Sequence, residues 1–102
     1  MIHVIATVTV IAGRRNEFLA AFHDVMPKVH AEDGCLEYGP AIDAETDIPA
    51  QARKGDDVLT VIEKWESVAA LKAHLVAPHM LEYRSRVKEL VAGSTLHVLE
   101  SA

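Results

Sequence analysis

The chain has 102 residues, half of them hydrophobic and a quarter charged, with a formal net charge of -5 at pH 7. This length and balance predict one globular domain over residues 1–102, with a core so small that much apolar surface stays near solvent. The acidic charge argues against a nucleic-acid partner, because phosphate binding needs clustered Lys and Arg.

The sequence shows no pattern typical of export or membrane insertion. Residues 1–10, MIHVIATVTV, have neither a basic leader nor a small-residue cleavage site. No apolar run approaches the roughly 18 residues that a membrane helix needs. We therefore expect a cytoplasmic protein with no membrane partner. The single cysteine, Cys35, excludes an intramolecular disulfide and a multi-cysteine zinc site.

The first half of the chain predicts a strand, a helix and a second strand. Residues 2–11, IHVIATVTVI, are rich in β-branched residues, and their alternate positions form one wholly apolar set and one mixed set. Apolar residues at spacings of one, three and four predict a helix from about Arg15 to Ala31, with Asn16 as its N-cap. CLEYGPAID then predicts a strand in which Gly39-Pro40 marks a bulge or an edge position.

The second half begins with a polar loop over residues 44–56, followed by a strand over 57–65. Ser67 is placed to cap a helix that runs to about Val76. A last helix is expected from about His79 to Val91, and Gly93 to stop it before a final strand, STLHVLE.

This order, β-α-β-β-α(α)-β, predicts an α+β chain of the ferredoxin-like, split βαβ type. Its four-stranded antiparallel sheet should carry helices on one face. The other face keeps apolar residues, and a second copy of the chain is the simplest cover for it.

Most of the candidate chemistry lies in EKWESVAALKAHLVAPHM, residues 63–80. His74 and His79 are five residues apart, whereas helical metal ligands need a spacing of three or four, so we expect no metal site. Glycine-rich nucleotide motifs are missing as well.

Polar groups interrupt two apolar helix stripes, at His74 and at Tyr83 and Arg84. The residues alone leave two interpretations of His74, a hydrogen-bonded interior histidine or a group that lines a ligand cavity. Arg84 can likewise line a cavity or extend to its edge.

The 63–80 segment resembles the signature of the antibiotic biosynthesis monooxygenase domain family, which includes small quinol monooxygenases. Its Glu-x-Trp strand end, its Ala-Leu-x-x-His helix and the following Pro-His carry the likeness. IHVIATVTVIAGRRNEFLAAF and EDGCLEYGPAID are similar to the family's first strand, first helix and second strand. The resemblance implies a homodimeric α+β barrel and a cavity between sheet and helices. It also implies oxidation of a hydroquinone- or anthrone-like aromatic by molecular oxygen, without metal or flavin cofactor.

Such an oxygenase must bind an aromatic ring, take a proton and stabilise the resulting oxyanion. His74 is the expected catalytic base. The expected substrate-binding residues are Trp65, His79, Tyr83, Arg84 and Tyr38. From the sequence alone core is the favoured interpretation of Trp65, and His79 can also be a surface residue at a helix start. Glu63 is interpreted as a paired charge at the end of a strand.

Other branches of the superfamily give alternative functions. Haem-degrading relatives carry an Asn on the first strand, a Trp where this chain has His74 and a His where it has Arg84, so haem degradation is not expected. An isomerase of a small phosphorylated signal molecule, and a dimeric ligand-binding module without turnover, both stay open. Converging cationic groups would favour the isomerase, and a filled interior would favour the binding module.

Overall fold

The computed structural model describes residues 1–102. Its elements follow the predicted order and run as β1 (Ile2–Val10), α1 (Arg15–His30), β2 (Cys35–Ala41), β3 (Val58–Trp65), α2 (Val68–Leu75), α3 (Pro78–Val87), a short 3-10 helix η1 (Lys88–Leu90) and β4 (Val91–Glu100).

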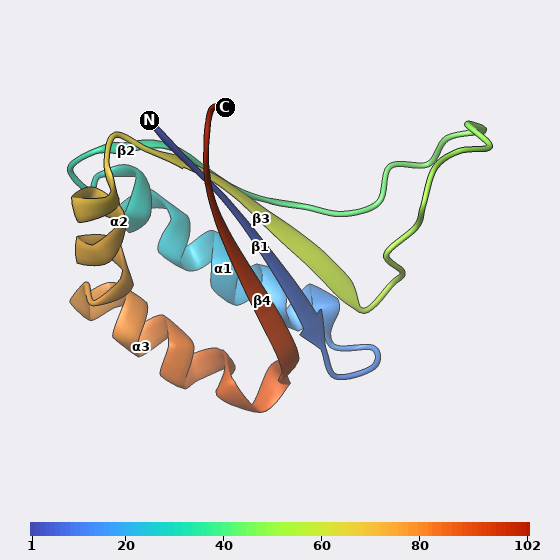
Figure 1. Cartoon of the computed structure of the whole chain (residues 1–102). Helices are drawn as coiled ribbons and strands as arrows, with labels where there is room; N and C mark the ends of the chain where they lie inside the picture. The colour runs from blue at the N-terminus through green and yellow to red at the C-terminus, as the bar shows by residue number, and fades with distance from the viewer.

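The four strands form one antiparallel sheet in the order β2-β3-β1-β4. All three α-helices lie on one side of this sheet, as Figure 1 shows. The predicted ferredoxin-like α+β fold is thus confirmed. None of the helices is both long enough and apolar enough to cross a membrane.

The alternation of β1 explains which face the helices cover. Ile2, Val4 and Val10 are buried beneath them, and Val4 lies opposite Glu63 on β3. Since paired residues point to the same side, Val61, Glu63 and Trp65 also face the helices. The alternation of side chains along β1, together with its pairing to β3, therefore determines on which side of the sheet each β3 side chain lies.

Helix α1 supplies the opposite wall of the core with Phe18, Ala21, Phe22, Val25 and Val29, all buried. Each large apolar side chain removed from water contributes about 1.5–3 kcal/mol, so burial of this stripe stabilises the packing of the helix on the sheet.

The N-terminal caps of α1 and α2 differ from each other in how they agree with the sequence. Asn16 is not the N-cap of α1, because the cap position is Arg14 and its side chain makes no capping hydrogen bond to a first-turn amide. Ser67 does cap α2, by accepting a hydrogen bond from the Ala70 amide at 3.1 Å.

The last helix ends earlier than predicted, at Val87, and Gly93 does not stop it. Val91 already pairs with Val10 in the sheet, and the Ile11 amide donates to the Leu90 carbonyl at 2.8 Å. Pairing with β1 therefore ends the helix, and Gly93 lies within β4 opposite Thr9, beside a register irregularity.

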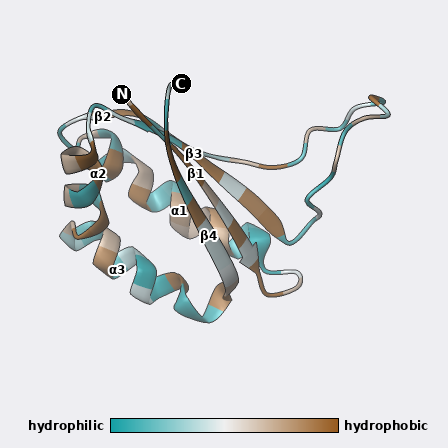
Figure 2. Cartoon of the chain, viewed as in Figure 1, coloured by the Kyte–Doolittle hydropathy of each residue, from teal (hydrophilic) through white to brown (hydrophobic).

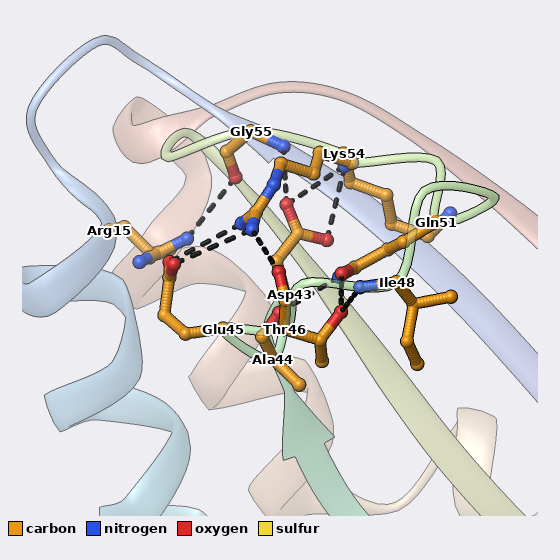
Figure 3. Close-up of polar contacts among 10 residues, drawn as sticks. Arg15, Asp43, Ala44, Glu45, Thr46, Ile48, Gln51, Lys54 and Gly55 are labelled. Carbon is orange, nitrogen blue, oxygen red and sulfur yellow. Dashed lines mark hydrogen bonds and ion pairs between the residues drawn. The ribbon is translucent and has the colours of Figure 1, made fainter.

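The predicted long loop is a projecting arm over residues 42–57 (Figure 1). Figure 3 shows its internal bracing: the Asp43 carboxylate accepts from the backbone amides of Lys54 and Gly55, at 2.9 Å each, and Gln51 donates to the Ala44 carbonyl at 2.8 Å. Arg15 ties the base of the arm to α1 through the Gly55 carbonyl. β2, which precedes the arm, is an edge strand, as Gly39-Pro40 predicted.

Hydrophobic residues run along the central strands, whereas α3 mixes hydrophobic and hydrophilic positions (Figure 2). Some apolar side chains lie on the sheet face away from the helices. Among these, Ile62 is 39% exposed and Leu99 is 49% exposed. The far face of the sheet is thus partly apolar and carries no helix.

Candidate active site

A cavity of about 420 Å³ lies between the helix-covered face of the sheet and the helices, lined by 17 residues of which 12 are hydrophobic. Its walls come from all four strands, the three α-helices and η1. The polar and titratable members of the lining are Tyr38, Glu63, His74, Tyr83, Arg84, Lys88 and Ser94. An apolar hollow with a few converging polar groups is the usual form of a small-molecule site.

His74 on α2 is 2% exposed and is held on three sides. Its ring lies 4.6 Å from that of Trp65 and 5.3 Å from that of Tyr38, measured between ring centroids. Its Nδ1 lies 2.8 Å from Oε2 of Glu32. Because a carboxylate can only accept, Nδ1 carries the hydrogen, and the neutral ring has its lone pair on Nε2.

His74 lines the cavity, and we infer that this lone pair faces it. No solvent-inaccessible side-chain nitrogen or oxygen lacks a hydrogen-bond partner, so Nε2 of His74, which has no partner in the protein, reaches accessible space. Burial is the largest influence on the His74 pKa and lowers it, while the hydrogen bond to Glu32 and the charge of Glu32 act in the opposite direction. The imidazole is therefore neutral near pH 7 and able to accept a proton.

Glu32 lies in the turn between α1 and β2, and the local sequence explains its position. Gly34 takes a φ of +81°, and a Cβ added there would come within 2.7 Å of the Ala70 Cβ. The Gly34 carbonyl accepts from the Glu66 amide at 2.9 Å. The glycine lets the turn lie against the start of α2, which brings Glu32 to His74.

The same oxygen of Glu32 also accepts from Nε2 of His79 at 2.8 Å. Glu32 thus joins the last turn of α2 to the first turn of α3. His79 itself does not line the cavity. It lies on a small groove between α1 and α3, of about 120 Å³, whose lining includes Asp24, Lys28 and Arg86.

Glu63 is 5% exposed and takes part in none of the ion pairs of the structure. Its interpretation as a paired strand-end charge is wrong, because the alternation of side chains along β3 places Glu63 on the face that the helices cover. Nε1 of Trp65 donates to Oε1 of Glu63 at 2.9 Å. Burial raises the Glu63 pKa to about 7, with the Trp65 hydrogen bond acting against it and the charge of Glu32 adding to it.

Tyr38 and Tyr83 form an aromatic wall with α1. Tyr38 stacks on Phe22 at 5.1 Å and 6°, and Tyr83 meets Phe18 and Phe22 edge-on at 6.1 Å. Burial is the main reason that the pKa of both phenols is raised, so both keep their protons near pH 7. Each can donate a hydrogen bond to an oxygen in the cavity.

The guanidinium of Arg84 donates to the Leu75 carbonyl, which ties α3 to the end of α2. Arg84 lines the cavity yet is an exposed residue, so it lies at the rim. Trp65 is fully buried behind His74 and Glu63 and is absent from the cavity lining. Four expected residues, Tyr38, His74, Tyr83 and Arg84, therefore meet at the cavity, whereas Trp65 and His79 support its polar groups from outside.

Comparison with known proteins identifies the family. The model of the antibiotic biosynthesis monooxygenase family matches residues 1–86. The chain belongs to this family. It is 35% identical over 102 residues to the probable quinol monooxygenase YgiN of Escherichia coli K12, covering 98% of this chain and 97% of that protein.

Two solved structures show the same fold. That of Rv0793 from Mycobacterium tuberculosis matches with a TM-score of 0.80 and 27% identity, over 99% of this chain and 94% of the other. That of PA3566 from Pseudomonas aeruginosa matches with a TM-score of 0.81 and 24% identity, over 99% of this chain and 93% of the other.

The positions of two carboxyl groups of this antibiotic biosynthesis monooxygenase domain were not predicted from the sequence. Glu63 could have been found, since it alternates with Val61 and Trp65 on a strand whose apolar set faces inward. Glu32 gave no such signal, because it lies in a turn 42 residues from His74 in the chain.

Proposed function

We propose that this chain is a cofactor-independent monooxygenase, acting as one domain over residues 1–102, that oxidises a small quinol- or anthrone-like aromatic with molecular oxygen. One observation carries the proposal: the free Nε2 of His74 faces a largely apolar cavity of about 420 Å³, and Glu32 fixes the ring from behind. Family membership and the name of the Escherichia coli relative support the same class of reaction.

The chemistry follows from this arrangement. A phenol donates electrons to oxygen far more readily once it has lost its proton, so the protein must create a phenolate in its site. Nε2 of His74 takes the proton, and the imidazolium that forms is stabilised by the Glu32 carboxylate at 2.8 Å. General base catalysis of this kind contributes about 10²–10⁴-fold to rate.

The other cavity residues bind and orient the ring. Tyr38 and Tyr83 offer protonated hydroxyls to substrate oxygens, and Arg84 supplies positive charge at the rim for the oxyanion. Trp65 and His79, both expected to bind substrate, are proposed to act indirectly, Trp65 by holding Glu63 and His79 by sharing Glu32.

We also propose that the working form is a homodimer in which a second copy covers the far face of the sheet. The apolar side chains of Ile62 and Leu99 on that face, together with half-buried Ile5, support this arrangement.

A second candidate is the isomerase of a small phosphorylated molecule. Arg84 and Lys88 both line the cavity, and two cations are what a phosphate group needs. The largely apolar lining, 12 hydrophobic residues out of 17, disfavours a dianion, which makes this the weaker candidate. A binding module without turnover is disfavoured as well, because His74 is bonded to a carboxylate and faces open space.

The test is oxygen consumption by the purified protein over a panel of hydroquinones, naphthols and anthrones, with autoxidation subtracted and a metal chelator present. The proposal predicts enzyme-dependent uptake with at least one of these substrates, unaffected by the chelator. No uptake with any of them would contradict it. Isomerisation of a small phosphorylated molecule without oxygen uptake would support the isomerase.

A further inference from the structure

Glu63 is a buried polar group that proton abstraction by His74 does not use. It is 5% exposed, and Trp65 holds its Oε1 through a hydrogen bond of 2.9 Å. The second oxygen has no partner in the protein, and because no inaccessible polar side-chain atom is unpaired, this oxygen reaches the cavity that Glu63 lines. One oxygen of the carboxyl group is thus hydrogen-bonded, and the other is free.

The surroundings of Glu63 provide no counter-ion in contact with it. The titratable and charged groups that face it from the elements around the cavity are Tyr38, His74, Tyr83, Arg84 and Lys88, with Glu32 beyond His74. None of them is hydrogen-bonded or ion-paired to Glu63. A buried carboxyl without a cation favours its neutral, proton-bearing form.

His74 and Glu63 act at the same part of the cavity. Both contact Trp65. The His74 ring lies against the Trp65 ring, and the Glu63 carboxyl accepts a hydrogen bond from Nε1 of Trp65. Tyr38 links them as well, since it lies opposite Glu63 in the sheet and edge-on to the His74 ring. A proton acceptor and a proton donor therefore face one bound molecule from neighbouring positions.

We propose that Glu63 is a second catalytic residue, the acid that gives a proton to the departing oxygen when the O–O bond of a substrate hydroperoxide breaks. The inference rests on the proposed function, which supplies the hydroquinone and the molecular oxygen.

The steps balance for a simple hydroquinone. His74 takes one hydroxyl proton, the phenolate gives two electrons to oxygen, and a peroxide forms on the adjacent ring carbon. The imidazolium returns its proton to the terminal oxygen, which makes the hydroperoxide and leaves His74 neutral.

His74 then takes the C–H proton of that same carbon, and the C–H electron pair forms a new carbonyl as the O–O bond breaks. The leaving hydroxide takes the Glu63 proton and departs as water. One oxygen atom is now in a hydroxyquinone and the other in water. A proton passing from imidazolium to carboxylate restores both groups.

The competing reaction explains why the acid matters. Without a proton donor at the departing oxygen, the hydroperoxide loses hydrogen peroxide instead and yields the plain quinone. The two routes differ in product and in the fate of oxygen. Glu63 would therefore decide whether the protein is an oxygenase or an oxidase.

The test is Glu63→Gln, which keeps the size of the side chain and an acceptor for Trp65 but has no acidic proton. Glu37→Gln is the matched control, since Glu37 is an exposed residue on the neighbouring strand and its one ion pair is with Lys64, at 3.9 Å. Hydroxyquinone, quinone and hydrogen peroxide are measured against oxygen consumed, with a quinol that the native protein oxidises.

For Glu63→Gln we expect hydroxyquinone formation to fall by about 10²–10⁴-fold, the range of general acid catalysis, while hydrogen peroxide approaches one molecule per oxygen consumed. Glu37→Gln should keep the native product ratio. The same ratio in Glu63→Gln and the native protein would overturn the inference and leave the proposed function standing. No uptake by the native protein would overturn both.

The native protein offers a second measurement that needs no substitution. Raising the pH through about 7 ionises Glu63, so the peroxide share of the products should rise with pH. A product ratio independent of pH over that range would also overturn the inference.

Discussion

Nδ1 of His74 and Oε2 of Glu32 lie 2.8 Å apart, in a contact that joins the second helix to the turn after the first. The contact fixes the tautomer of His74 and leaves Nε2 as the only ring nitrogen free to take a proton. The proposed chemistry depends on this pair more than on any other contact.

Glu32→Gln should weaken the base without removing it. Glu32 raises the His74 pKa by its hydrogen bond and its charge, so its loss lowers that pKa further, and the acidic limb of the activity profile moves to lower pH. The amide can also donate to Nδ1 and impose the wrong tautomer, so we expect kcat to fall by up to about 10²-fold. The measurement is kcat against pH, with Glu66→Gln as an exposed control. A profile that matches the native one would show that Glu32 only supports the fold.

His74→Asn should abolish enzyme-dependent oxygen uptake, a loss of about 10²-fold or more. The Asn amide can still donate to Glu32, whereas nothing replaces the lone pair of Nε2. The more obvious His74→Ala change would remove a ring packed on Trp65 and Tyr38 and cost about 2–4 kcal/mol of stability, which would confuse the result. Native circular dichroism and native uptake in His74→Asn together would exclude His74 as the base.

Glu63 should make the free energy of unfolding depend on pH. Its pKa is raised from an ordinary 4.5 to about 7 in the folded chain. Between these values the unfolded chain releases the proton and the folded chain keeps it, so stability is greatest below the lower value and falls until about pH 7. The total loss is about 3 kcal/mol, at about 1.4 kcal/mol for each pH unit.

Glu63→Gln lacks this dependence. Urea unfolding of both proteins at about pH 5 and about pH 8 measures it, and the native protein should lose about 2–3 kcal/mol more than the variant between the two conditions. An equal loss in both proteins would mean that Glu63 titrates normally.

Trp65→Phe should move the alkaline limb of oxygenation to higher pH. The Nε1 hydrogen bond lowers the Glu63 pKa, so removing it lets that pKa rise and keeps the acid protonated longer. The lost bond and the smaller ring should also cost about 1–3 kcal/mol in urea unfolding. A limb that stays in place, or moves to lower pH, would show that Trp65 does not tune Glu63.

Ile62→Asp tests the proposed dimer. The residue lies on the sheet face without helices, 39% exposed, so an added charge should be tolerated in one chain and opposed between two apolar surfaces. Light scattering should give twice the mass of one chain for the native protein and the mass of one chain for the variant. A native monomer, or a variant that stays dimeric, would contradict this use of the face.

The fold could be predicted from local patterns because each element carries its own signal. Alternation in β1, the apolar stripe of α1 and the Ser67 cap are all features of neighbouring residues. The end of α3 could not be predicted in this way, since it depends on Val91 pairing with Val10, some eighty residues earlier in the chain. Here long-range sheet pairing overrides a helical pattern.

The same distinction between local patterns and long-range packing applies to the residues of the site. His74, Tyr83 and Arg84 interrupt apolar stripes and could be selected from the sequence. The positions of Trp65 behind the cavity and of His79 outside it depend on how α2 and α3 pack, which no spacing along one helix encodes. The bond from His74 to Glu32 depends on a tight turn at Gly34, so only the folded chain brings the two together.

We propose that His74 starts a reaction in which one atom of molecular oxygen is inserted into an aromatic ring without a cofactor. The most direct measurement supplies isotopically labelled oxygen to the chelator-treated protein with a quinol that it oxidises, and determines the label in the product by mass spectrometry. We expect one labelled atom in the product of the native protein and none above the autoxidation background with His74→Asn. Product without label from the native protein, or equal labelling in both, would contradict it.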